Sequence, residues 1–270
     1  MTTTPPATKS RLRRVRWGRW LIVLAVAVSA YGAWMESAKR RAIRLVEEAG
    51  FKWYERNIVT EVRDDWRNLF NKESWASDVR DLKARAGLSP IRINTEDLRS
   101  ALVRLRVRDL ELSRMPEPTD LDFIRGIDSI RDLFIVDFPA LKNISALRGL
   151  PHLRGIYIGS CPALTDLTGI ADLPALQGLS IYGKSGTFSV RPLTNLPKLA
   201  MIWLIRVPVP RDLSTVSGLP ALKILRIDPA SDVPAEEVAA LNEQIAAIKK
   251  ARPALRTDFS DPGKVFTPLR

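Results

Sequence analysis

The sequence predicts an α/β solenoid of about six consecutive units, preceded by an apolar helix and closed by helical caps. The first observation is a fixed period of 23 residues between residues 105 and 232. The second is that each unit has apolar residues at its first, fourth and sixth places, which is typical of a strand with one buried face. With a period of this length, each unit can bury its apolar edge only against its neighbours. Proline restarts the units at Pro151, Pro174, Pro197 and Pro220.

The unit that begins at Leu153 shows the pattern most fully. Ile156 and Ile158 alternate with Gly155 and Tyr157, which predicts a strand over residues 153–158. After this strand, apolar residues recur at every third position, which predicts a short, tight helical turn. The equivalent strands are predicted to begin at residues 107, 130, 153, 176 and 199, with a sixth at 222.

The pattern L-x-x-L-x-L-x-x-N/C occurs in full from Leu153 to Cys161, and residues 105–230 resemble the leucine-rich repeat family. The resemblance implies an arc with a parallel sheet on its concave side and short helices or extended turns on its convex side. It also implies that Cys161 lies in a turn, where the family uses Asn or Cys to bond buried backbone. We expect this polar ladder to be mostly lost, and we expect a bulged loop at residues 183–188. The positions equivalent to Cys161 are Met115, Phe138, Lys184 and Val207.

Residues 20–35 form an uncharged apolar run that predicts a transmembrane signal-anchor helix. A helix of this length covers roughly 24 Å at about 1.5 Å per residue, slightly short of a hydrocarbon core. Trp17, Trp20 and Trp34 flank the run, as interfacial anchors do. A cleaved signal peptide with its core at residues 21–27 is the alternative.

The basic tail at residues 1–19 contains six of the 42 basic residues and accounts for half of the net charge of +12. Four basic residues follow the apolar run, so the positive-inside rule favours a cytoplasmic N-terminus and places the repeats outside the cytoplasm. Because so much of the charge lies in this tail, we expect no nucleic-acid partner.

Residues 36–104 carry no repeat, and we expect a helical stalk and N-terminal cap there. Helices are predicted at 37–49, 60–70 and 75–86, with a last one from Asn94 or Thr95 through Leu102, and a short strand at 51–54. The sequences at Ala42–Tyr54 and Asp64–Phe70, together with the order of segments, are similar to bacterial single-span leucine-rich repeat proteins of unassigned role. That resemblance implies an architecture and a compartment, not a ligand.

The C-terminal part is predicted to begin with a capping helix over residues 233–251. Val238, Leu241, Ile245 and Ile248 share one stripe of this helix, which we expect to cover the last repeat. Residues 252–270 are expected to form a loosely held tail.

No constellation of residues in the chain predicts catalysis, a cofactor or a metal site. His152 is the only histidine and is expected in an exposed return loop. Cys161 is the only cysteine, so neither an intramolecular disulfide nor a C-x-x-C metal site can form. The sequence therefore predicts a non-enzymatic protein with a buried, structural thiol.

The functional candidates lie on the concave face, where one residue of each strand points away from the core. Phe134, Tyr157, Tyr182 and Trp203 are expected to form an aromatic stripe, with Glu111 and Arg226 near its ends. Exposed aromatic side chains are typical of protein interfaces, which predicts a protein or peptide ligand and leaves carbohydrate open. The aromatics could instead pack on one another, or under the N-terminal cap or the C-terminal tail.

Charge changes along the predicted arc, since Asp109, Glu111 and Asp132 come early and Arg206, Lys223 and Arg226 come late. Together, the sequence predicts a membrane-anchored interaction module that presents its repeats outside the cytoplasm. The alternatives are a structural or self-associating envelope component, and a secreted binder if the N-terminal segment is cleaved.

Overall fold

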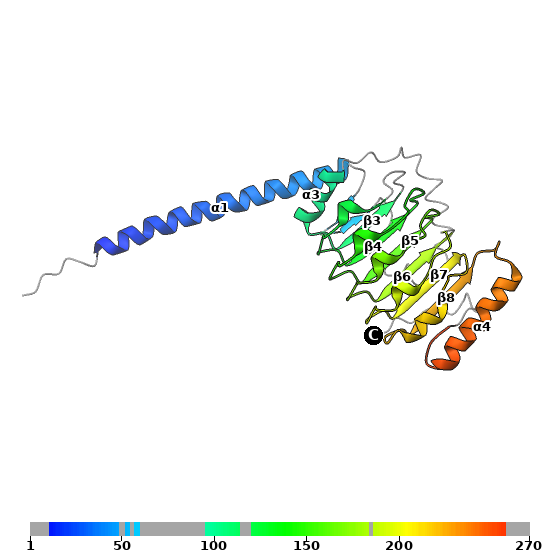
Figure 1. Ribbon diagram of the computed structural model, residues 1–270. Helices are drawn as coiled ribbons and strands as arrows, with labels where there is room; N and C mark the ends of the chain where they lie inside the picture. The colour runs from blue at the N-terminus through cyan, green and yellow to red at the C-terminus, as the bar shows by residue number, and fades with distance from the viewer. Residues whose placement is uncertain are drawn as a thin grey trace, which may run out of the picture.

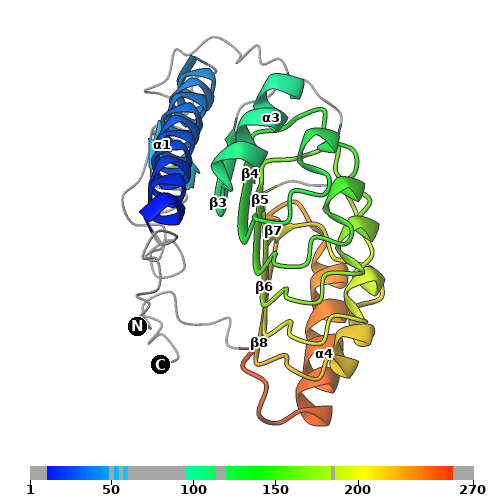
Figure 2. The same ribbon diagram turned by 90° about the vertical axis from the view of Figure 1, so that its left-hand side faces the viewer.

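The computed structural model describes residues 11–48, 52–54, 57–59, 95–113, 120–183 and 186–257, with the side chains of the first helix described over 24–47. One sheet of eight strands follows the chain order, and short helical turns cover one of its sides (Figures 1 and 2). β1 (Lys52–Tyr54) pairs antiparallel with β2 (Asn57–Val59), and all later neighbours pair in parallel. The remaining strands are β3 (Asp109–Ser113), β4 (Asp132–Val136), β5 (Gly155–Gly159), β6 (Gly178–Tyr182), β7 (Met201–Val207) and β8 (Ile224–Pro229).

The 23-residue period fixes the register of the parallel strands. Leu133 pairs with Ile156, Ile156 with Leu179, Leu179 with Ile202, and Ile202 with Leu225. All five side chains are buried, which confirms the predicted α/β solenoid. The strands begin two residues later than predicted. For β4 to β8, the N–H of the residue before the strand and that of the first strand residue both donate to one carbonyl oxygen of the previous unit.

Short 3-10 helices form where apolar residues recur at every third position, as predicted. In the third unit, the N–H of Ile170 donates to the carbonyl of Leu167 at 3.0 Å, and both side chains are buried. Bonds between residues three apart place every third side chain on the same face, so the whole apolar series enters the core. These helices are η2 (Asp122–Ile124), η3 (Ser145–Leu147), η4 (Thr168–Ile170), η5 (Arg191–Leu193) and η6 (Leu213–Gly218).

A column of polar side chains, which was not among the predictions from the sequence, precedes the 3-10 helices. The side-chain oxygens of Asp120, Asn143, Asp166 and Ser189 each accept a hydrogen bond from the backbone N–H two residues on, at 2.8–3.2 Å. The fifth member, Asp212, accepts from the Ser189 hydroxyl at 2.6 Å. The first four of these bonds hold the turn and satisfy N–H groups at the start of η2 to η5.

A second column consists of residues with left-handed backbone, which directly follow β4, β5 and β6 and lie near the end of β7. Asp137, Ser160, Gly183 and Arg206 have φ between 54° and 83°, and successive members are one repeat apart. The first three donate their N–H to a carbonyl at the end of the next strand at 2.9–3.0 Å, so pairing continues through the bend. Glycine adopts this conformation freely, whereas other residues lose about 1–2 kcal/mol each.

The column of Cys161 is apolar rather than polar in the described units. Phe138, Cys161 and Val207 are each at most 1% exposed, in agreement with the expected loss of an Asn ladder. In the predicted bulged loop at 183–188, residues 184 and 185 lie outside the described residues and Phe188 is buried in the core. A register shift occurs instead in β7, between Ile205 and Val207.

The N-terminal end of the solenoid is covered by the end of α1 (Arg11–Glu48) and by α3 (Thr95–Leu105). Ala42 and Val46 of α1 join Leu98 and Leu102 of α3 in the main core. Arg99 of α3 donates to two carbonyl oxygens around η2, including that of Arg125 at 2.6 Å. The predicted strand at 51–54 corresponds to β1, and the predicted helices at 60–70 and 75–86 lie outside the described residues.

The C-terminal end is covered by α4 (Ala235–Ala251), which packs against η6. Leu241, Ile245 and Ile248 of the predicted stripe are buried. The expectation of a loosely held tail from residue 252 is wrong for residues 252–257. The Arg252 guanidinium donates to the carbonyl oxygens of Ser217, Leu219 and Leu222, and Arg256 bridges to Ile224 beside β8.

Helix α1 extends away from the solenoid as a single continuous rod (Figure 1). Among the residues that the structure describes, no helix is both long and apolar enough to cross a bilayer. The predicted span at residues 20–35 falls partly outside the described side chains, so it stays a prediction.

The polar column leads to a stability prediction at Asp166, whose carboxylate accepts from the Thr168 N–H at 2.8 Å and from its hydroxyl at 3.1 Å. We expect Asp166→Ala to lower the free energy of unfolding by about 1 kcal/mol, as loss of a helix-start acceptor does. Asp166→Asn keeps the acceptor oxygen and should restore most of this loss. Chemical denaturation of the three proteins measures the difference, and equal losses in both variants would contradict the assigned role.

Candidate functional site

The predicted candidate residues lie on the concave side of the sheet, in two adjacent rows. Strand register places Glu111, Phe134, Tyr157, Trp203 and Arg226 in one row that crosses β3, β4, β5, β7 and β8, with Ser180 on β6 completing it. Tyr182 belongs to the neighbouring row, opposite Gly159 and Ile205. The sheet thus brings all six residues onto one surface.

This surface is more buried than the predicted exposed stripe. Tyr157 is 9% exposed and Ser180 is 4% exposed. Phe134, Tyr182 and Trp203 are half-buried. The centre of the row is therefore a packed surface, and greater exposure occurs toward the strand ends, where Arg206 is exposed.

Aromatic contacts connect the two rows and their flanks. Phe134 and Tyr157 stack with centroids 6.0 Å apart and planes inclined by 26°. A Cβ at Gly159 would lie 2.9 Å from the Tyr157 hydroxyl oxygen, so a glycine there leaves room for the tyrosine ring. At the strand ends, the Arg206 guanidinium lies 5.7 Å from the centroid of Tyr182, within the range of a cation–π interaction.

An acidic pair occupies the N-terminal end of the same sheet. Asp109 and Asp132 are register partners, and the carboxylate of Asp132 leans over Gly155, where a Cβ would lie 2.4 Å from its Oδ1. Burial raises the pKa of Asp132 to about 6, and the neighbouring negative charge of Asp109 and a hydrogen bond with it add to this effect. Arg154 and Arg131 oppose the shift without cancelling it. Both acids are predicted early in the arc from the sequence, but apolar periodicity carries no information on the contact between their side chains.

The only histidine and the only cysteine of the chain lie in different environments. His152 is exposed in its loop, as expected. Cys161 is 1% exposed, and burial raises the pKa of its thiol to about 12. A thiol with this pKa is not an available nucleophile near neutral pH. Within the described ranges, no group of three or more His, Cys, Asp or Glu side chains could hold a metal ion.

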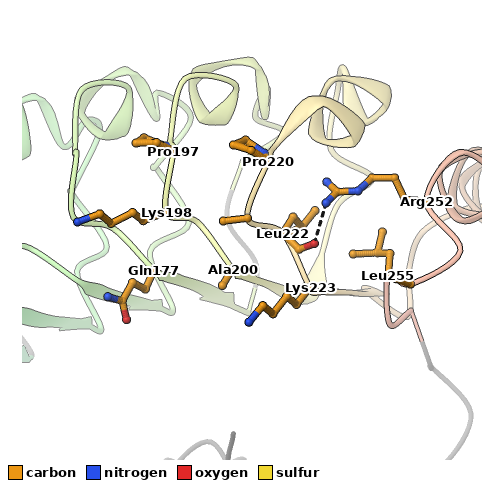
Figure 3. Close-up of a pocket in the computed structure, with 11 residues that line it drawn as sticks. Gln177, Pro197, Lys198, Ala200, Pro220, Leu222, Lys223, Arg252 and Leu255 are labelled. Carbon is orange, nitrogen blue, oxygen red and sulfur yellow. Dashed lines mark hydrogen bonds between the residues drawn. The ribbon is translucent and has the colours of Figure 1, made fainter.

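A cavity of about 590 Å³ lies at the C-terminal end of the repeats, between two return loops and residues 252–255 (Figure 3). Its lining includes Lys198, Lys223 and Arg252 and contains no acidic residue. The Arg252 side chain is directed at the loop backbone, where it donates to the Leu222 carbonyl at 3.0 Å. We assign Arg252 to closing the solenoid, in the same way that Arg99 closes the other end.

The acidic pair predicts a pH-dependent stability. Since the folded pKa of Asp132 is about 6 and its ordinary value is 3.8, the folded state holds the extra proton between these values. The free energy of unfolding should therefore fall as the pH rises through this interval. We expect Asp132→Asn to stabilise the protein by roughly 1–2 kcal/mol at pH 7 and by much less at pH 4. Thermal unfolding at both pH values, with the exposed Asp128→Asn as control, measures this, and an equal gain at both would contradict it.

Comparisons with solved structures found partial likenesses at low sequence identity. Internalin C2 of Listeria monocytogenes shares 22% identity with a TM-score of 0.40, and the match covers 62% of this chain and 89% of the internalin. Another Listeria monocytogenes internalin shares 17% identity with a TM-score of 0.29 and coverages of 58% and 55%. A leucine-rich repeat protein of Leptospira interrogans shares 14% identity with a TM-score of 0.25 and coverages of 61% and 62%.

No protein-family model and no curated protein matches the chain. The assignment therefore rests on the geometry of the molecule itself. Its parallel strands repeat at 23-residue spacing, and β4, β5 and β6 are each followed by a left-handed residue, a polar turn residue and a 3-10 helix. This order and register form a solenoid of the kind that the resemblance to the leucine-rich repeat family implies.

Proposed function

We propose that the chain is a non-enzymatic interaction module, anchored in a membrane by α1, whose concave sheet binds a protein or peptide outside the cytoplasm. The observation that carries the proposal is the row set by strand register, in which Phe134, Tyr157 and Trp203 lie on one surface with a charged residue at each end. Preordered aromatic side chains bind at a low entropic cost, which favours an interface.

The apolar part of α1 supports the anchoring. Every residue from 24 to 36 is exposed in the isolated chain. Among them Val26, Val28 and Tyr31 are each more than 60% exposed, around different sides of the helix. A helix that is apolar on all sides requires a lipid or protein environment. The excess of basic residues before residue 20 favours the orientation in which the N-terminus is cytoplasmic.

Self-association in the cell envelope is a second candidate, and the same exposed helix favours it, since two copies could cover each other along α1. It differs from the first proposal in where contact occurs, because it does not require the concave sheet. The two candidates can therefore be separated by the position of a crosslink.

We expect a photoreactive phenylalanine analogue in place of Tyr182 to crosslink a partner in intact cells. Trp203→Ala in the same chain should reduce the adduct at least about tenfold, because aromatic interface residues contribute about 2 kcal/mol or more. The same analogue in place of Ser214, exposed on η6, is the control outside the sheet. An adduct of two 30.3 kDa chains, formed from the same analogue in place of the exposed Tyr31 of α1 and absent from Tyr182, would support self-association. Equal adducts at Tyr182 and Ser214 would contradict binding by the sheet.

We expect Val26→Asp combined with Val28→Asp to release the protein from the membrane fraction after carbonate extraction. Each aspartate adds about 2.5–3.5 kcal/mol to the cost of insertion near the centre of a span. Val103→Asp, at an exposed position of α3, is the matched control and should stay in the membrane fraction. Unchanged retention of the double variant would contradict anchoring by α1. A mature chain that begins after Ala30 would support the secreted alternative.

A further inference from the structure

Arg226, at the C-terminal end of the concave row, is a cation without an ion-pair partner among the described residues. Its side chain is half-buried, and its Nε is buried without a hydrogen-bond partner in the part of the chain that the structure describes. Asp228, two residues along the same strand, is exposed and forms no ion pair with it within these described residues. From this unpaired guanidinium we infer that Arg226 is the receptor for a carboxylate of the bound peptide.

The physical reason is the cost of leaving such a donor unmatched. A buried N–H without an acceptor costs about 1–3 kcal/mol, and more when the group is charged. Arg252 and Arg99, at the two ends of the solenoid, each satisfy their guanidinium groups with backbone carbonyls. Arg226 therefore differs from these structural arginines, and its unused donors fit a ligand rather than the fold.

The chemistry of the ligand follows from the donor and its surroundings. The Nε of Arg226 is buried, so the two terminal Nη–H groups of the guanidinium form the planar fork that matches the two oxygens of a carboxylate. Trp203 is the register partner of Arg226 on β7, so a carboxylate at Arg226 would bring its apolar neighbours over the indole ring. Arg206 and Lys223 are exposed in the same half of the arc, whereas Asp109 and Asp132 lie at the other end. A peptide with its acidic residue toward β8 therefore has the complementary charge.

This inference rests on the proposed function, and matched peptide arrays test it with the full chain in detergent micelles. One array carries blocked peptides with one Asp or Glu, the second carries the same peptides with Asn or Gln, and the third carries neutral peptides with a free C-terminal carboxylate. We expect binding to the first or third array to exceed binding to the second by at least about tenfold, as charge-assisted bidentate bonds require. Binding to the first array would indicate a side-chain carboxylate, and binding to the third would indicate a C-terminal carboxylate.

Arg226→Lys keeps the charge but removes the fork, and it should lose most of the preference for carboxylate peptides. Arg211→Lys, at an exposed position outside the sheet, should keep it. Arg226→Met should leave the thermal midpoint of the unliganded protein unchanged or higher, since it removes an unmatched charge.

Two results would overturn the inference while leaving the proposed function intact. The first is binding that depends on Trp203 but is equally strong for the acidic peptides and for their amide counterparts. The second is an Arg226→Lys protein that keeps the full preference for carboxylate peptides. A fall in the midpoint of Arg226→Met by more than about 5 °C would also overturn it, because it would make Arg226 a structural residue. Binding to none of the arrays would overturn both the inference and the proposed peptide ligand.

Discussion

The structure depends on one constraint, which is that the apolar edge of each 23-residue unit can be buried only by the next unit. No unit has a core of its own, because Leu133, Ile156, Leu179 and their equivalents become buried only when the strands align without slippage. A shift of one residue would exchange the buried and concave faces of a strand. The repeating 3-10 helices, the left-handed bends and the two arginine-closed ends all maintain this alignment.

The sequence was sufficient to predict the features that depend on apolar periodicity. The strand order, the 3-10 helices and the burial of Cys161 follow from a pattern that every unit repeats. The polar column could also have been found, because Asp120, Asn143 and Asp166 are one period apart and are all residues that hold turns. The left-handed column was harder to predict from the sequence, since only one of its four members, Gly183, is the glycine that such a backbone conformation favours. Its other members adopt the bend because the repeat imposes it.

The candidate site shows where sequence periodicity ceases to be informative. The pattern placed six residues on one surface, but it could not give the 9% exposure of Tyr157 or the contact between Asp109 and Asp132. Those features depend on side-chain directions and on glycines, such as Gly155 and Gly159, that leave space for a neighbour. The same limit applies to Arg252, which looked like part of a polar tail and instead binds three carbonyl oxygens. The hydrogen-bond partners of a long side chain depend on the tertiary structure around it, which the local sequence does not show.

The continuity of α1 has a mechanical consequence. Its C-terminal end is fixed to the core by Ala38, Ala42 and Val46, so no flexible hinge lies between the exposed rod and the first repeats in that helix. A chain anchored through such a rod would hold its sheet at a constant height, set by about 1.5 Å for each residue beyond the lipid. Such a chain would find a ligand by lateral diffusion in the membrane and by rotation about the axis of the rod. A flexibly tethered domain, in contrast, can also reach ligands at other heights. Ligands carried at the same height would therefore be favoured over others with equal affinity.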